Sequence, residues 1–132
     1  MKDAISVLRE CHIQPTPQRI AVVDYVLNTR AHPSADEVLE HARKKCPTVS
    51  RATVYNTLNL MVKKGLLKTQ LLKEGTVFFD PNMGKHHHFI DNETGDIYDI
   101  PWDHLQITEK ERLKGFEISE YQVIMRGRRK KK

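Results

Sequence analysis

The chain has 132 residues, of which 39% are hydrophobic and 30% charged, with a net charge of +5 and a pI near 9.3. This length allows one domain or two small ones with a modest core. No apolar run approaches the ~18 residues of a membrane span, and the N-terminus lacks the basic-then-apolar pattern of a secretory signal. We therefore expect a cytoplasmic protein with no membrane partner.

The first half of the chain predicts helices followed by a β-hairpin. Apolar residues at steps of three and four indicate the helices, and most of these begin after a capping hydroxyl residue. The predicted helices cover residues 4–11, 17–32, 35–45 and 51–64, and the caps are Thr16, Ser34 and Ser50. Gly65 is positioned as the stop of the fourth helix. Residues 66–72 and 76–80 then read as two strands around a glycine turn.

This order of elements is typical of a winged helix-turn-helix. The polar face of the predicted fourth helix carries groups suited to base edges and phosphates, whereas a merely solvated helix face would carry a Glu/Lys mixture. A recognition helix presents its N-terminal residues to the major groove. We predict that residues 1–80 form a DNA-binding domain. Its predicted DNA contacts are Thr16, Arg19, Ser50, Arg51, Thr53, Tyr55 and Asn56.

Residues 81–132 predict a second, α/β domain, so the fold class is α+β. Strands are predicted over 86–91 and 96–100, a short helix over 108–114, and a last strand over 116–126 that is apolar on both faces. A piece of about fifty residues rarely builds a sufficient core without metal, disulfides or a partner chain. The two cysteines, Cys11 and Cys46, predict no disulfide framework. We therefore predict a homodimer formed through this half.

The basic run at the end of the chain, residues 126–132, is predicted to be a solvated, disordered tail. Such a tail adds non-specific, salt-sensitive affinity for nucleic acid.

One set of side chains suits a single metal ion. In a strand, alternate side chains share a face, so two histidines of the run 86–88 point one way and His87 the other. Imidazoles and carboxylates without sulfur suit Fe(II) or Mn(II), and Zn(II) is expected to bind in vitro as well. Each residue alone would be an ordinary histidine or aspartate, and His87 is predicted to be exposed or to support the ligands from behind. The candidate ligands are His32, Asp80, His86, His88 and Asp99.

Six stretches in order along the chain carry a family resemblance. They cover residues 16–19, 31–36, 50–58, 65–66, 79–88 and 115–119. Through them the chain resembles the ferric uptake regulator (Fur) family of bacterial metal-dependent repressors, and within it most resembles the peroxide-stress regulators (PerR). The resemblance implies an N-terminal winged helix, a hinge and a C-terminal dimerisation domain.

The resemblance also implies how the site acts. The five ligands would hold one regulatory ion per subunit, joining the two domains so that the dimer matches a palindromic operator. Asp99, where a glutamate would be typical of Fur proper, favours the peroxide branch. In that branch hydrogen peroxide reacts at the iron form and oxidises a ligand histidine, here His32 or His86. The remaining alternatives are an iron- or manganese-uptake regulator without peroxide sensing, and, from another class, a non-haem iron enzyme using His86, His88 and Asp99.

Departures from the family pattern give two further expectations. Asp91 and Thr94 stand where most relatives have the first cysteine pair of a structural zinc site, and a lysine run replaces the second pair. We therefore expect no structural zinc. Tyr121 stands where another family metal site has a histidine, so that site is expected to be absent or degenerate. The protein is expected to be a regulator, not an enzyme.

Overall fold

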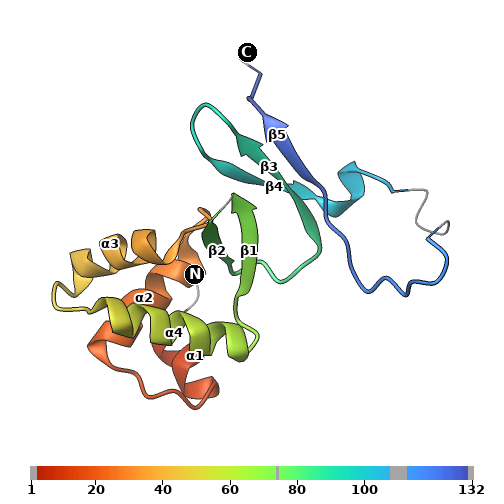
Figure 1. Cartoon of the computed structure of the whole chain (residues 1–132). Coiled ribbons are helices and arrows are strands. Elements are labelled where there is room, and N and C mark those ends of the chain that lie inside the picture. Colours follow the sequence, from red (N-terminus) through yellow and green to blue (C-terminus); the bar gives the residue numbers. More distant parts are fainter. Residues whose placement is uncertain (1–2, 74, 108–112, 131–132) are drawn as a thin grey trace. The chain divides into compact units, whose positions relative to one another are not determined.

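The structure is a computed structural model that describes residues 3–73, 75–107 and 113–130. It divides into two compact units, the first ending at Met83 and the second beginning at Gly84 (Figure 1). The sequence places this boundary slightly earlier, after Asp80. Within the described residues, no helix is both long and apolar enough to cross a membrane.

The helices of the first unit start at the residues that their capping signals indicate. They are α1 (Ala4–Glu10), α2 (Pro17–Asn28), α3 (Ala35–Lys45) and α4 (Arg51–Lys63). At the start of α3 the Ser34 hydroxyl accepts from the Glu37 amide, and the Glu37 carboxylate accepts from the Ser34 amide, which completes a capping box. Helix α2 ends earlier than predicted because the Thr29 hydroxyl accepts from the Ala31 amide and turns the chain away from the helix axis.

Helix α4 ends where Gly65 was expected to stop it. Gly65 has a φ of +77°, in the left-handed region that glycine adopts without strain. Its amide donates to the Val62 carbonyl (3.1 Å), and the Leu66 amide donates to the Met61 carbonyl (2.9 Å). This pair of bonds is the Schellman motif, which satisfies the last carbonyls of the helix and directs the chain into the hairpin.

The four helices enclose an apolar core, and a two-stranded wing follows it. The side chains with no solvent exposure in this core are Val22, Val23, Val26, Val38, Val54, Leu58 and Met61. The wing consists of β1 (Lys68–Lys73) and β2 (Thr76–Asp80), paired antiparallel with an irregularity between Gln70 and Lys73. The first unit is therefore a winged helix, as predicted.

A short bridge ties the wing to the loop before α3. Ser34 pairs with Phe78, and the Phe79 amide donates to the Pro33 carbonyl at 2.9 Å. The bridge fixes the loop residue His32 next to the end of β2, where Asp80 lies.

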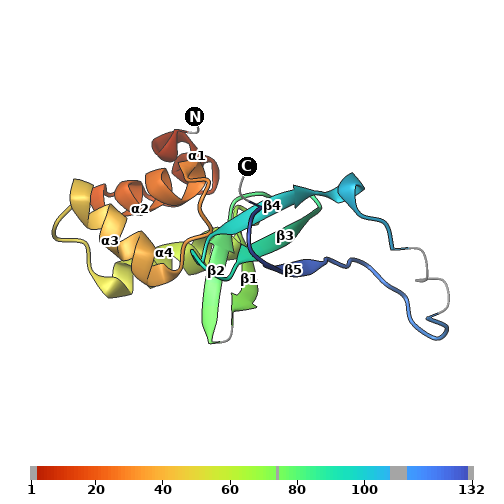
Figure 2. The same ribbon diagram turned by 90° about the horizontal axis from the view of Figure 1, so that it is seen from above.

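The second unit is a small sheet. Its elements are β3 (His86–Asp91), β4 (Ile97–Pro101), the 3-10 turn η1 (Trp102–His104) and β5 (Ile124–Gly127). Among the described residues the strand order is β4-β3-β5, with β4 antiparallel and β5 parallel to the central β3 (Figure 2). The chain as a whole has the predicted α+β architecture.

The last strand is much shorter than the sequence predicts. The prediction covered residues 116–126, but the strand comprises only Ile124–Gly127. Its parallel register pairs Ile124 with His88, so residues before 122 would need partners ahead of His86, where β3 has not begun. Phe116 and Ile118 accordingly remain exposed. The predicted helix over 108–114 falls mainly outside the described residues.

The basic run at the end of the chain is not a free tail where the structure describes it. Arg126 lies in β5, and the Gly127 carbonyl accepts from the Asn92 amide at 2.7 Å. The Arg128 guanidinium lies 3.7 Å from the Glu93 carboxylate, and that of Arg129 lies over the Tyr98 ring. The disordered-tail prediction was wrong for these residues, because a run of charges in the sequence does not reveal the acidic and aromatic partners on the β3–β4 hairpin.

Candidate functional site

Strand β3 places two histidines on one face of the sheet of the second unit. The rings of His86 and His88 lie 4.6 Å apart, and both side chains are buried. His88 pairs directly with Asp99 across the ladder to β4. The Asp99 Oδ1 atom lies 3.5 Å from His86 Nε2 and 3.6 Å from His88 Nε2. The alternation predicted from the sequence is confirmed, and three potential ligand atoms converge.

The remaining ring nitrogen of each histidine is engaged by an acceptor. His86 Nδ1 lies 2.7 Å from the Gly84 carbonyl, and His88 Nδ1 lies 3.0 Å from the Gln122 side-chain oxygen. Because carbonyl and amide oxygens only accept, both Nδ1 atoms carry the proton in these bonds. In the neutral ring each Nε2 then presents a lone pair on the side of Asp99. This is the arrangement in which histidines bind metals.

The first unit contains a second, smaller group of the same kind. His32 Nε2 lies 3.6 Å from Asp80 Oδ2, and both side chains are buried. The other Asp80 oxygen accepts from the Asn82 amide at 2.9 Å. The Pro33–Phe79 bond described above holds the histidine loop against the strand end. The structure thus brings the two predicted ligands of this unit together.

The spacing within each group fits metal ligation. Two ligand atoms ~2.1 Å from a shared ion, at an angle of roughly 110°, lie about 3.4 Å apart. The observed nitrogen–oxygen separations of 3.5–3.6 Å match that geometry. A cation placed between an Nε2 lone pair and a carboxylate oxygen would attract both. In the second unit, one ligand atom from each of His86, His88 and Asp99 lies within 4.8 Å of the others.

His87 takes the opposite face of β3 and is fully buried. Its ring stacks on Trp102 with centroids 4.6 Å apart, and its Nδ1 accepts from the Val123 amide at 2.8 Å. The sequence left open whether His87 is exposed or supports the ligands from behind, and the first of these predictions is wrong. The sequence gives no sign of this burial, because Trp102 and Val123 lie in other segments.

The predicted DNA contacts lie near the starts of α2 and α4 in the first unit. Arg51, Tyr55 and Asn56 project from the exposed face of α4, and Thr53 is half-buried. The Arg51 guanidinium pairs with the Asp36 carboxylate of α3, and the hydrogen bond raises the pKa of Arg51 further above its already high value. Ser50 caps α4 by accepting from the Thr53 amide. Contacts within the protein therefore hold Ser50 and Arg51 in place at the start of α4.

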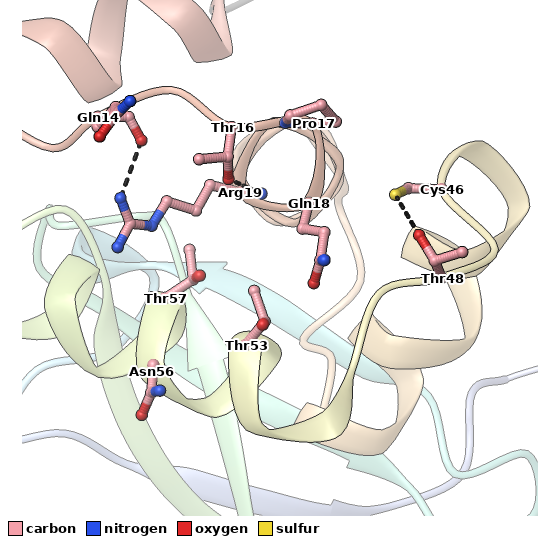
Figure 3. A pocket seen from close by; sticks show the side chains of 10 residues that line it. All are labelled: Gln14, Thr16, Pro17, Gln18, Arg19, Cys46, Thr48, Thr53, Asn56 and Thr57. Carbon is pink, nitrogen blue, oxygen red and sulfur yellow. Dashed lines mark hydrogen bonds between the residues drawn. The ribbon is translucent and has the colours of Figure 1, made fainter.

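A hollow of about 540 Å³ lies between the start of α2 and α4 (Figure 3). Thr16 caps α2 by accepting from the Arg19 amide, and the Arg19 guanidinium donates to the Gln14 carbonyl at 3.0 Å. Thr53, Asn56 and Thr57 line the α4 side. Thr57 was not among the predicted site residues; its hydroxyl is buried and has no hydrogen-bond partner within the described chain.

Comparison with known proteins assigns the chain to a family. Residues 10–126 match the ferric uptake regulator family model. The chain belongs to the ferric uptake regulator family. It is 33% identical over 129 residues to the peroxide operon regulator of Bacillus subtilis, covering 96% of this chain and 89% of that relative.

Solved structures of the family superpose on the whole chain. The ferric uptake regulator from Pseudomonas aeruginosa with manganese has a TM-score of 0.71 at 25% identity and covers 98% of this chain and 100% of its own. The Campylobacter jejuni peroxide stress regulator has a TM-score of 0.66 at 26% identity, covering 100% and 99%. The fold is thus the two-domain α+β fold of the family, a winged helix followed by a smaller sheet unit. The protein is a transcription regulator of this family and not an enzyme.

Several residues that build the site could not be found from the sequence. Gln122 and the Gly84 carbonyl contact the rings of His88 and His86, and Trp102 and Val123 contact that of His87. Gln122 lies in the segment predicted as a strand, but no local signal indicates which residue of β3 it faces.

Proposed function

We propose that the protein is a metal-dependent DNA-binding repressor that works as a homodimer in the cytoplasm. The observation that supports this most directly is the pair of imidazole–carboxylate groups at ligand spacing, one in the winged-helix unit and one in the sheet unit. Two donors are too few to hold an ion firmly, and three leave coordination positions open. We propose that a single ion takes His32 and Asp80 from the first unit and His86, His88 and Asp99 from the second.

The donor set favours Fe(II) or Mn(II) as the ion, with one regulatory site per subunit. Nitrogen and oxygen donors without sulfur suit these ions, and Zn(II) is expected to compete in vitro because later metals bind such sites more tightly. No structural zinc is proposed. Asp91, at the first expected cysteine position, uses its carboxylate to accept from the Glu93 and Thr94 amides.

Metal binding and DNA binding would be coupled through the relation between the units. Ligands from both units fix one relative pose when they share an ion. In a homodimer that pose sets the distance between two α4 helices, which must match half-sites of a palindromic operator about one helical turn apart. The ion and the operator then stabilise the same conformation, and each raises the affinity for the other.

The second unit also supports dimer formation. Phe116 is 75% exposed and Ile118 is 43% exposed in the isolated chain. Large apolar side chains left in solvent over one segment are typical of an interface. A second copy of the chain would cover them and supply the stability that a unit of this size lacks on its own.

Hydrogen peroxide is the proposed signal. Bound Fe(II) would supply the redox chemistry, in which one oxygen of the peroxide is added to a ligand imidazole while the other leaves as water. The candidate rings are His32 and His86. Addition of oxygen makes the ring a poor ligand, so the repressor would lose its ion and its operator. Mass spectrometry of the iron form after peroxide should show +16 on a peptide containing one of these histidines, and the Mn(II) form should show none.

A second candidate function is control of metal uptake without peroxide sensing. The similarity to a ferric uptake regulator solved with manganese supports it, since that Pseudomonas aeruginosa protein is 25% identical to this chain and the peroxide stress regulator is 26% identical. Peroxide would then leave operator binding by the iron form unchanged, which separates the two functions.

The test of the metal switch is operator binding by fluorescence anisotropy with Mn(II) and with chelator. We expect Mn(II) to raise affinity by roughly 5- to 150-fold in the wild type. Asp99→Ala should abolish this response, whereas Asp96→Ala, an exposed aspartate just before the same strand, should keep it. Equal affinity with and without chelator in the wild type would reject the proposed switch.

A further inference from the structure

A short segment before β5 contacts two consecutive histidines of β3. Gln122 Oε1 lies 3.0 Å from His88 Nδ1, and the His88 amide donates to the Val123 carbonyl at 3.1 Å. The Val123 amide donates in turn to His87 Nδ1 at 2.8 Å. His87 and His88 are both fully buried. These bonds join residues 34 and 36 positions apart, so they depend on the fold and not on local sequence.

The bond to Gln122 fixes which nitrogen of His88 carries the proton. A neutral imidazole has one N–H and one lone pair, and the partners decide which nitrogen has which. The side-chain oxygen of Gln122 accepts, so the proton lies on Nδ1 and the lone pair on Nε2.

Without Gln122 we expect the proton of His88 to move from Nδ1 to Nε2. The Asp99 carboxylate, 3.6 Å from Nε2, is a charged acceptor near the ring and then draws the proton to that nitrogen. An Nε2 that carries a proton cannot bind a metal until the proton leaves. Gln122 therefore competes with Asp99 for the His88 proton and keeps the ligand nitrogen available.

The same segment sets His87 in the opposite tautomer. The Val123 amide is a donor, so His87 Nδ1 holds the lone pair and Nε2 holds the proton. The ring is also fixed by stacking on Trp102, whose ring centroid lies 4.5 Å from that of Tyr121. His87 is thus arranged to hold the segment in place and not to bind an ion, although it lies between two ligands.

We propose that Gln122 is a positioning residue for the metal site: it orients His88 and fixes its Nδ1–H tautomer, so that metal affinity depends on docking of residues 121–123 against β3. This rests on the proposed function, because it takes His88 as a ligand. Residues that support a metal ligand in this way commonly change affinity by 10- to 100-fold when mutated.

The test compares Mn(II) affinity of the full chain among three variants. Gln122→Leu keeps the side-chain size and removes the acceptor, and its dissociation constant should rise by roughly 10- to 100-fold. Gln122→Glu keeps an acceptor, and should bind at least as tightly as the wild type. Gln106→Leu, the same change at an exposed glutamine of the same unit, should bind as the wild type does.

A second measurement does not require metal. ¹⁵N NMR of the metal-free wild type at about pH 8, where an ordinary histidine is neutral, reports the protonated nitrogen of each ring. We expect Nδ1–H for His88 and Nε2–H for His87, and a shift of His88 toward Nε2–H in Gln122→Leu. This spectrum of the wild type decides the question even if the leucine variant does not fold.

The outcomes are separable. Wild-type affinity in Gln122→Leu, or an Nε2–H tautomer of His88 in the wild type, would overturn the role of Gln122 while leaving the metal switch intact. Failure of the wild type to bind Mn(II) at all would reject the proposed metal site, and the role of Gln122 with it.

Discussion

Replacing Thr57 by valine is expected to stabilise the winged-helix unit. The Thr57 side chain is 1% exposed, and its hydroxyl has no hydrogen-bond partner within the described chain. A buried hydroxyl without a partner costs about 1–3 kcal/mol relative to a satisfied one. Valine has the same shape with a methyl group in place of the hydroxyl, and its helix propensity is close to that of threonine. We expect Thr57→Val to raise the free energy of unfolding by ~1–2 kcal/mol.

The assay is thermal and urea unfolding followed by circular dichroism. If the unit of some eighty residues unfolds cooperatively, each 1 kcal/mol corresponds to about 4–8 °C in Tm. Thr53→Val, one turn earlier on the same helix, is the matched control. The Thr53 hydroxyl bonds to the Ser50 hydroxyl at 2.9 Å, so its loss should not stabilise the unit. A destabilised Thr57→Val protein would refute the reasoning and show that the hydroxyl has an acceptor in solution.

Three further changes test other features. The pKa of Asp91 lies below its usual value near 3.8, mainly because the Glu93 amide donates to its carboxylate, with smaller effects of the Thr94 amide and Arg129. The charged carboxylate therefore stabilises the fold above pH 3.8, and this stabilisation is lost as the pH falls through the lowered pKa. The urea midpoint of Asp91→Asn should therefore lie below that of the wild type at neutral pH and approach it in acid. A difference between the two midpoints that does not change with pH would contradict this. Gly65→Ala should cost ~1 kcal/mol because of the positive φ, and Gly65→Asn less, as measured by urea unfolding. Leu58→Ala should lower the free energy of unfolding by about 2–5 kcal/mol in the same assay, and Asn59→Ala, at an exposed position, by under roughly 0.5 kcal/mol. Equal losses of stability in the two variants would mean that Leu58 is not in the core.

Local signals explain what the sequence could predict. The caps at Thr16, Ser34 and Ser50 are read from a few neighbouring residues, and the structure starts helices after each of them. Strand alternation likewise predicts that His86 and His88 share a face. These features depend on backbone geometry that holds wherever a helix or strand forms.

Features that depend on partners distant in the sequence were missed. The apolar pattern of residues 116–126 predicted a long last strand. A strand also needs a neighbouring strand to pair with, and the register with β3 leaves only Ile124–Gly127 paired. The same register brings Gln122 to His88, and nothing in either segment alone encodes it. Arg128 and Arg129 are exposed, as predicted, but the contacts that order them were missed because their partners Glu93 and Tyr98 are more than thirty positions away.

The parallel pairing of β5 with β3 has a consequence for biosynthesis. During translation the histidine strand leaves the ribosome well before the segment that bonds to its rings, since Gln122 follows His88 by 34 positions. Closure of so long a loop is a slow, non-local event compared with formation of the helices. The nascent winged helix can therefore fold while the histidines of β3 still lack their contacts with residues 122 and 123, and on the proposed function full metal affinity develops only once β5 has been added to the sheet.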